Sequence, residues 1–136
     1  TPQALANTAW AYSKSGVAAP ALFEAIARVA PAKIGAFTPQ ALANTAWAYS
    51  TAEVAVPALF EAIAREAVPK VNTFKPQELA NTTWAFSKAR IAAPALFEAI
   101  ARVAPAKIGA FTPQALANTA WAYSTAGVPA PALFEA

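Results

Sequence analysis

The stretch FTPQALANTAWAYS, from Phe37 to Ser50, decides the fold because near copies of it recur along the chain. The copies reach the same point of the pattern every 37 residues, at Thr1, Thr38, Lys75 and Thr112. A period in the thirties is typical of helical repeats, whose units are too small to bury their own apolar faces and therefore stack on their neighbours. We predict an all-α chain, an α-solenoid of tandem 37-residue helix-turn-helix repeats.

All 136 residues fit one repeat array, with units 1–37, 38–74, 75–111 and a partial unit 112–136. Residues 18–52 recur letter for letter as residues 92–126, which indicates duplication of a two-unit block. The pattern starts and stops inside a unit. We therefore expect the chain to be a window on a longer protein.

Each unit carries signals for two helices. Thr38 supplies an N-cap hydroxyl, and Pro39 suits the first helical position, where a missing N–H is harmless. Phe37 and Leu42 have the spacing of a hydrophobic staple, which Phe74 with Leu79 and Phe111 with Leu116 repeat. The second helix begins at a proline of its own and ends near the next one, which predicts helices over 2–14 and 20–29 in the first unit. In each second helix, a Glu and an Arg lie four residues apart. This spacing predicts a solvated helix face with ion pairs.

Composition excludes several kinds of active site. The chain has no Cys and no His, so metal sites built on these residues, Cys nucleophiles and Ser-His-Asp triads are impossible. The acidic residues are all Glu, and four of the seven share one repeat position, unlike an acid/base pair. We therefore expect no enzyme, no metal, no cofactor and no small-molecule substrate. Prolines and amides interrupt the longest uncharged stretch, 108–134, so we also expect no transmembrane segment.

A polar stripe follows the first helix of each unit, because spacings of four, three and four residues put its members on one side. The candidate RNA-contacting residues are Gln3, Asn7, Lys14, Gln40, Asn44, Gln77, Asn81, Lys88, Arg90, Gln114 and Asn118. Carboxamides can donate to and accept from a base edge, and Lys or Arg can meet a phosphate. Modular proteins that take about one base per helical repeat use this chemistry. Single-stranded RNA is therefore the predicted partner.

The tryptophans of the stripe have two possible roles. An indole can stack on a base, but a tryptophan at fixed spacing among leucines and alanines is more often part of a core. The residues open to both roles are Trp10, Trp47, Trp84 and Trp121. The amides also have a structural alternative, since they could tie down neighbouring backbone inside the stack.

Charge leaves a second function open. The net charge is +3 and charged residues make up 12% of the chain, against about 25% in typical soluble domains. A weak positive charge gives RNA little electrostatic attraction. The low charge favours a structural or linker subunit held in a large protein or ribonucleoprotein assembly. The stripe also hardly varies between units, whereas a base-by-base code needs variable readers.

The copies resemble the heptatricopeptide and octotricopeptide repeats of algae and other protists, which often precede a RAP domain. The resemblance rests on Phe37–Ser50 and on PALFEAIA at Pro57–Ala64, and the period of 37 matches the heptatricopeptide length. It implies a protein imported into a chloroplast or mitochondrion that acts in RNA stability, processing or translation, or in an organellar ribosome. It also implies that the first helix of each unit lines the RNA-facing surface.

Overall fold

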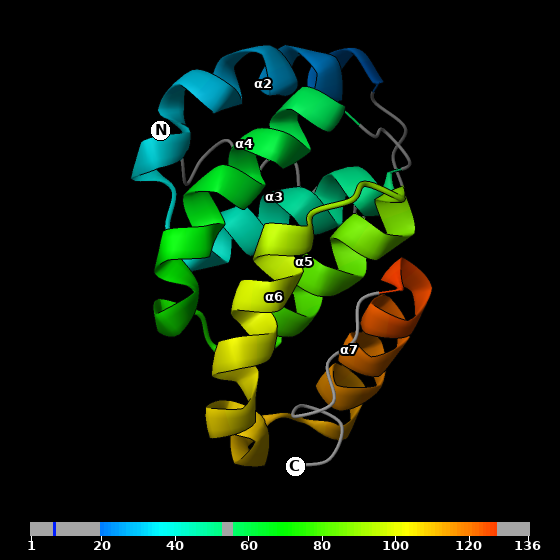
Figure 1. The fold of residues 1–136 in the computed structure, drawn as a ribbon. Helices are drawn as coiled ribbons and strands as arrows, with labels where there is room; N and C mark the ends of the chain where they lie inside the picture. Colours follow the sequence, from blue (N-terminus) through cyan, green and yellow to red (C-terminus); the bar gives the residue numbers. More distant parts are fainter. Residues whose placement is uncertain (1–6, 8–19, 53–55, 128–136) are drawn as a thin grey trace.

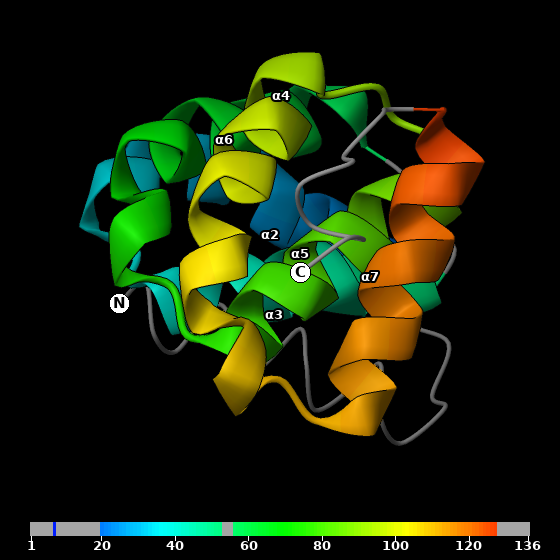
Figure 2. The same cartoon turned by 60° about the horizontal axis from the view of Figure 1, so that its bottom comes forward.

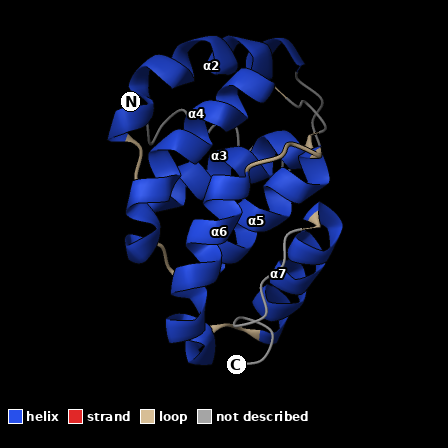
Figure 3. Cartoon of the chain, in the orientation of Figure 1, coloured by secondary structure: helices blue, strands red, loops and turns tan. Residues whose placement is uncertain are grey.

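The computed structural model of the chain describes residue 7 and the ranges 20–52 and 56–127 (Figure 1). All regular structure in these ranges is helical, without strands (Figure 3), so the all-α prediction is confirmed there. The α-helices are α2 (Pro20–Lys33), α3 (Pro39–Thr51), α4 (Pro57–Ala67), α5 (Pro76–Ala89), α6 (Pro94–Val103) and α7 (Pro113–Ala126). Short 3-10 helices follow α2, α4 and α6, at Ile34–Ala36, Val68–Thr73 and Ala104–Ala110.

The helices begin at prolines that follow the period of the sequence. α3, α5 and α7 start at Pro39, Pro76 and Pro113, each 37 residues after the one before. The same step separates the starts of α2, α4 and α6, at Pro20, Pro57 and Pro94. Of the helix expected over 2–14, the structure describes Asn7, which is helical; the helix expected from Pro131 lies outside the described residues.

The starts of α3, α5 and α7 are capped by side chains. The Thr38 hydroxyl accepts a hydrogen bond from the Ala41 N–H at 3.1 Å, and Thr112 repeats this at the start of α7. Lys75 cannot accept such a bond, so α5 uses Glu78, whose Oε1 accepts from the Lys75 N–H at 2.8 Å. Each cap satisfies a backbone donor that lacks a partner within its helix.

One of the three described second helices ends later than expected. α2 continues through Pro31 to Lys33 instead of stopping near residue 29. α4 and α6 do stop before the next proline, and Pro69 and Pro105 fall in the 3-10 segments that follow. A 3-10 segment keeps short-range hydrogen bonds while the chain turns, so the connection to the next unit is ordered helix rather than an open turn.

The expected Glu–Arg ion pairs of the second helices do not form within 4 Å. All of their members are exposed: Glu24, Arg28, Glu61, Arg65, Glu98 and Arg102. In the described part of the chain, the ion pair joins Glu66 to Lys70 at 2.8 Å instead. Exposed pairs gain little over hydration by water, which explains the absence of fixed contacts on a face that is solvated as predicted.

The helices lie in two rows (Figures 1 and 2). One row is formed by α3, α5 and α7 in sequence order, and the other by α2, α4 and α6. We call them the first-helix row and the second-helix row. Helices of the first-helix row pack closely, whereas neighbouring helices of the second-helix row touch at few positions. Buried alanines such as Ala43, Ala46 and Ala80 permit the close packing, because the spacing of helix axes depends on side-chain size.

The core lies between the two rows and is built from aromatic pairs. Three rings from the second-helix row each meet a ring of the following first helix edge to face, with centroids about 5 Å apart: Phe23–Tyr49, Phe60–Phe86 and Phe97–Tyr123. The hydroxyls of Tyr49 and Tyr123 donate to the backbone carbonyls of Phe23 and Phe97 at 2.5 and 2.6 Å. Burial raises the pKa of both tyrosines above the ordinary value.

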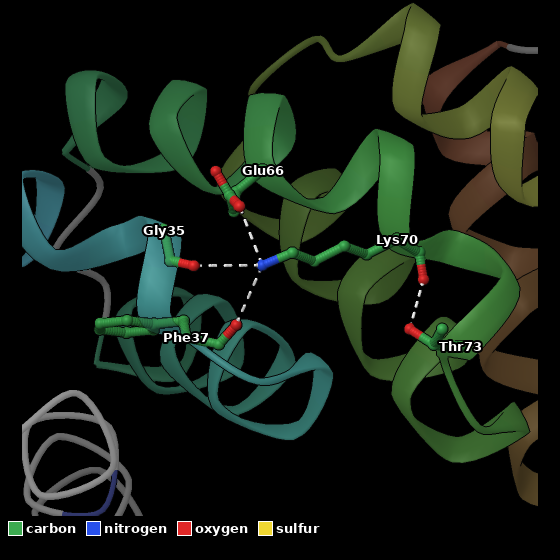
Figure 4. A network of polar contacts seen from close by, with 5 residues as sticks. All are labelled: Gly35, Phe37, Glu66, Lys70 and Thr73. Carbon is green, nitrogen blue, oxygen red and sulfur yellow. Dashed lines mark hydrogen bonds and ion pairs between the residues drawn. The ribbon is translucent and has the colours of Figure 1, made fainter.

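A lysine ties each connecting segment to the one before it. Lys70 Nζ donates to the carbonyl oxygens of Gly35 at 3.4 Å and Phe37 at 3.3 Å, while it also pairs with Glu66 (Figure 4). The carbonyl of Lys70 in turn accepts from the Thr73 hydroxyl at 2.7 Å.

Lys107 repeats this contact one period later. Its Nζ donates to the carbonyl oxygens of Asn72 at 2.8 Å and Phe74 at 2.6 Å. Ammonium groups satisfy carbonyls that a turning backbone leaves without a partner. Both lysines therefore act inside the fold, which reduces the positive charge free to meet RNA.

Candidate nucleic-acid interface

The predicted amides lie on the first-helix row. Gln40, Gln77 and Gln114 are exposed, and the asparagines one turn further along are half-buried: Asn44, Asn81 and Asn118. Gln77 Nε2 donates to Asn81 Oδ1 at 2.9 Å, and Gln114 makes the same bond to Asn118. In both pairs the amides bind each other rather than neighbouring backbone. The glutamine oxygen and the asparagine amino group take no part in this bond, so each pair can offer one acceptor and one donor to a ligand.

The tryptophans of the row form a ladder. The rings of Trp47 and Trp84 lie 6.4 Å apart at an interplanar angle of 29°, and those of Trp84 and Trp121 lie 6.4 Å apart at 39°. Trp47 and Trp84 are half-buried, and Trp121 is 45% exposed. Sequence reasoning missed the stacking of indole on indole, although the invariant period, which aligns equivalent residues of neighbouring helices, was the available signal.

Two cations stand at the C-terminal end of α5. Lys88 is exposed, with Nζ 5.9 Å from the centroid of the Trp84 ring, a cation–π distance. Arg90 follows the helix and is also exposed. Neither makes an ion pair in the described residues. Thr51 and Thr125 take the place of Lys88 in α3 and α7, so the charge is concentrated on α5.

Of the candidate residues in the first unit, the structure describes Asn7. Gln3, Trp10 and Lys14 lie outside the described residues, whereas Asn7 is helical and exposed. The structure brings the other candidates together on α3, α5 and α7, with Arg90 at the end of α5. Amides lie near the start of each helix, the indole in the second half, and the cations at the end of α5.

In the described residues, no group of three His, Cys, Asp or Glu is placed to hold a metal ion, and none of the helices there has the length and apolarity to cross a membrane. One hollow of about 450 Å³ lies at the C-terminal ends of α5 and α7. Another, of about 510 Å³ and mainly apolar, lies between α4 and α6.

These features define a class: an all-α protein whose helix pairs recur with the sequence period and whose first-helix row presents aromatic, amide and basic groups. The family model of RNA-editing substrate-binding complex 6 protein (RESC6) matches residues 2–136, and the chain belongs to this family. No curated protein matches the chain significantly.

The assignment to heptatricopeptide or octotricopeptide repeats was therefore wrong. Proline starts, small stacking residues and a period in the thirties follow from the physics of stacked helix pairs, so they do not separate one helical-repeat family from another. The family found does agree with the broader expectation of an organellar, RNA-related role with RNA and protein-complex partners.

Proposed function

We propose that this chain is a stretch of α-solenoid that binds single-stranded RNA along its first-helix row. In this proposal it acts within a mitochondrial RNA-editing substrate-binding complex, and it binds RNA without catalysing a reaction. The observation that carries the proposal is the tryptophan ladder, which crosses three neighbouring helices beside repeated amide pairs and Lys88. Stacking on aromatic side chains and hydrogen bonds to base edges are the usual means of binding unpaired RNA.

Stacking supplies more of the expected affinity than charge. The partly exposed indoles, with Trp121 the most exposed, can each contribute about 1 to 3 kcal/mol per stacked base. Lys70 and Lys107 are held by backbone carbonyls, and among the described residues Lys88 and Arg90 stand near the ladder without an ion pair. We therefore expect binding that weakens only gradually with added salt.

The repetition of the site predicts its preference. Gln77 with Asn81 and Gln114 with Asn118 make the same bond at 2.9 Å, one period apart. Successive nucleotides would therefore meet the same donor and acceptor. This favours a low-complexity or homopolymeric tract over mixed sequence, since a code would need different groups in each unit.

A binding screen with the four RNA homopolymers, each about 15 nucleotides long, tests the proposal. One homopolymer should bind at least about tenfold tighter than the weakest. Asn81→Ala should weaken that binding, and the matched control Asn72→Ala, an exposed asparagine in a connecting segment, should not. Equal binding to all four that disappears in high salt would eliminate base recognition. Absence of binding to any would refute RNA binding by this chain.

The mainly apolar hollow between α4 and α6 favours a second function on the opposite row. Its lining includes Val68, Pro69, Pro94 and Leu96. In this alternative the second-helix row contacts another protein of the same complex, and the chain serves as a scaffold. Ala95→Glu, which puts a charge into the hollow, should then reduce co-purification of the complex without changing RNA affinity. Unchanged co-purification would exclude this contact.

A further inference from the structure

Arg90 occupies a position that favours glycine. It has φ 60° and ψ 39°, in the left-handed region. The Arg90 N–H donates to the Ser87 carbonyl at 3.1 Å and the Ile91 N–H to the Phe86 carbonyl at 3.0 Å, which together form a Schellman motif at the end of α5. At the equivalent place after α7 the residue is Gly127, with φ 70°. A side chain in this conformation is strained, and such strain is concentrated at functional positions.

The strained residue lines the hollow of about 450 Å³ at the C-terminal ends of α5 and α7. Thr125 supplies a hydroxyl from α7, and Phe86 and Ile91 form apolar walls. The Ser87 hydroxyl donates to the Ala122 carbonyl at 2.8 Å, which links the two helices below the hollow. A planar guanidinium beside a hydroxyl suits a tetrahedral oxyanion, because it offers several donors in a fixed arrangement.

The charged side chains at this end of α5 are positive. Arg90 and Lys88 make no ion pair in the described part of the chain. Lys70 and Lys107 are held by backbone carbonyls. Arg28, Arg65 and Arg102 lie on the second-helix row, each four residues after a glutamate.

We propose that Arg90, with Thr125, binds a backbone phosphate of single-stranded RNA whose bases lie against Trp84 and Trp121. This inference rests on the proposed function and adds one fixed phosphate position to it. The tryptophan ladder belongs to the same two helices that form the hollow. RNA is favoured over an acidic protein because it supplies both an anion and flat aromatic bases.

Arg90→Gly separates binding from folding. Glycine relieves the left-handed strain, so the melting temperature should rise by about 4 °C. Affinity for the best-bound homopolymer of about 15 nucleotides should nevertheless fall about tenfold, and the log–log salt slope should become shallower by about 0.7. Arg102→Gln is the matched control: it removes one exposed positive charge from the second-helix row and should change affinity by less than about twofold.

The possible outcomes separate this inference from the proposed function. Equal affinity of Arg90→Gly and the unmodified chain would overturn the phosphate pocket while RNA binding stands. Equal losses in Arg90→Gly and Arg102→Gln would also overturn it, because net charge alone would then explain the effect. Displacement of the RNA by polyglutamate from the unmodified chain, but not from Arg90→Gly, would assign the pocket to acidic protein segments instead. Absence of RNA binding by the unmodified chain would refute both ideas.

Discussion

α3 and α7 have the same sequence, residue for residue, over 38–52 and 112–126, yet they are buried differently. Leu42 is 0% exposed and its counterpart Leu116 is 41% exposed. Trp47 is half-buried, whereas Trp121 is 45% exposed. α3 has α5 beside it, and no further first helix follows α7 in the described part of the chain. Burial of the same side chain is therefore set by the neighbouring helix.

The difference is confined to one side of the helix. The residues buried or half-buried in α3 but exposed in α7 are Pro39/Pro113, Leu42/Leu116, Ala43/Ala117, Ala46/Ala120, Trp47/Trp121, Ser50/Ser124 and Thr51/Thr125. We call this side the stacking face. Tyr49 and Tyr123, which contact the second-helix row, are buried alike. Each first helix thus uses one side for the second helix that precedes it in the chain and the other side for the first helix of the next unit.

The largest expected contrast is between Leu42→Ala and Leu116→Ala. Leu42→Ala should lower the free energy of unfolding by about 3 kcal/mol, because it opens a cavity at a closed helix contact. Leu116→Ala should cost only about 1 kcal/mol, since Leu116 is already 41% exposed to water. Urea denaturation of the two variants measures the contrast. Equal losses would show that the stacking face of α7 is covered in solution.

The tryptophan pair should show a smaller contrast in stability but a shared effect on binding. Trp47→Ala should cost about 2 kcal/mol of unfolding free energy, below the value for a fully buried tryptophan because Trp47 is half-buried. Trp121→Ala should cost about half as much. Both should weaken RNA binding, as measured by fluorescence anisotropy, since both belong to the ladder. If a variant has lower stability but unchanged RNA affinity, the tryptophan ladder packs the helices together and does not bind RNA.

The tyrosine pair should show no contrast. Tyr49→Phe and Tyr123→Phe each remove one buried hydrogen bond to a backbone carbonyl, so each should cost about 1 kcal/mol. Phe86, which occupies the same position in α5, shows that the ring alone packs there. Thermal or urea denaturation is the measurement. A loss restricted to Tyr49→Phe would mean that the contact between α6 and α7 is weaker than the one between α2 and α3.

The smallest expected effect is on pH dependence. Burial raises the pKa of both tyrosines, so ionisation at alkaline pH favours the unfolded chain. Each buried tyrosine contributes fully to the stability of the fold when the pH is well below the ordinary pKa of about 10. This contribution is lost as the pH rises above that value. At a pH of about 10, each tyrosine should already lower the free energy of unfolding by about 0.4 kcal/mol relative to neutral pH. The double variant Tyr49→Phe, Tyr123→Phe should lose this part of the alkaline destabilisation, and an unchanged pH profile would contradict the assignment.

The sequence predicted the local parts of the structure well. Thr38 and Pro39 mark a helix start because a cap and a proline act within one turn. The repeated helix starts follow from the period. The prediction of Glu–Arg ion pairs was wrong because water competes for exposed charged groups. Spacing brings the two charges near each other, but it does not fix a contact between them.

The parts of the site that depend on neighbouring helices could not be predicted from the pattern alone. The stripe correctly placed the amides and indoles on the first helix, but the contact between Trp47 and Trp84 arises from stacking of two units. The charge of Arg90 can be seen in the sequence, whereas its left-handed backbone depends on how α5 ends. The exposure of Trp121 could not be predicted either, because the sequence around Trp121 is the same as the sequence around Trp47.

The central claim is that RNA lies on the first-helix row. The most direct test is photo-crosslinking of the chain to a single-stranded RNA that carries 4-thiouridine, followed by mass spectrometry of the linked peptides. The account predicts crosslinks in peptides from α5 and α7, which carry Trp84, Lys88 and Trp121. Crosslinks confined to α4 and α6 would contradict it, because they would place the RNA on the second-helix row.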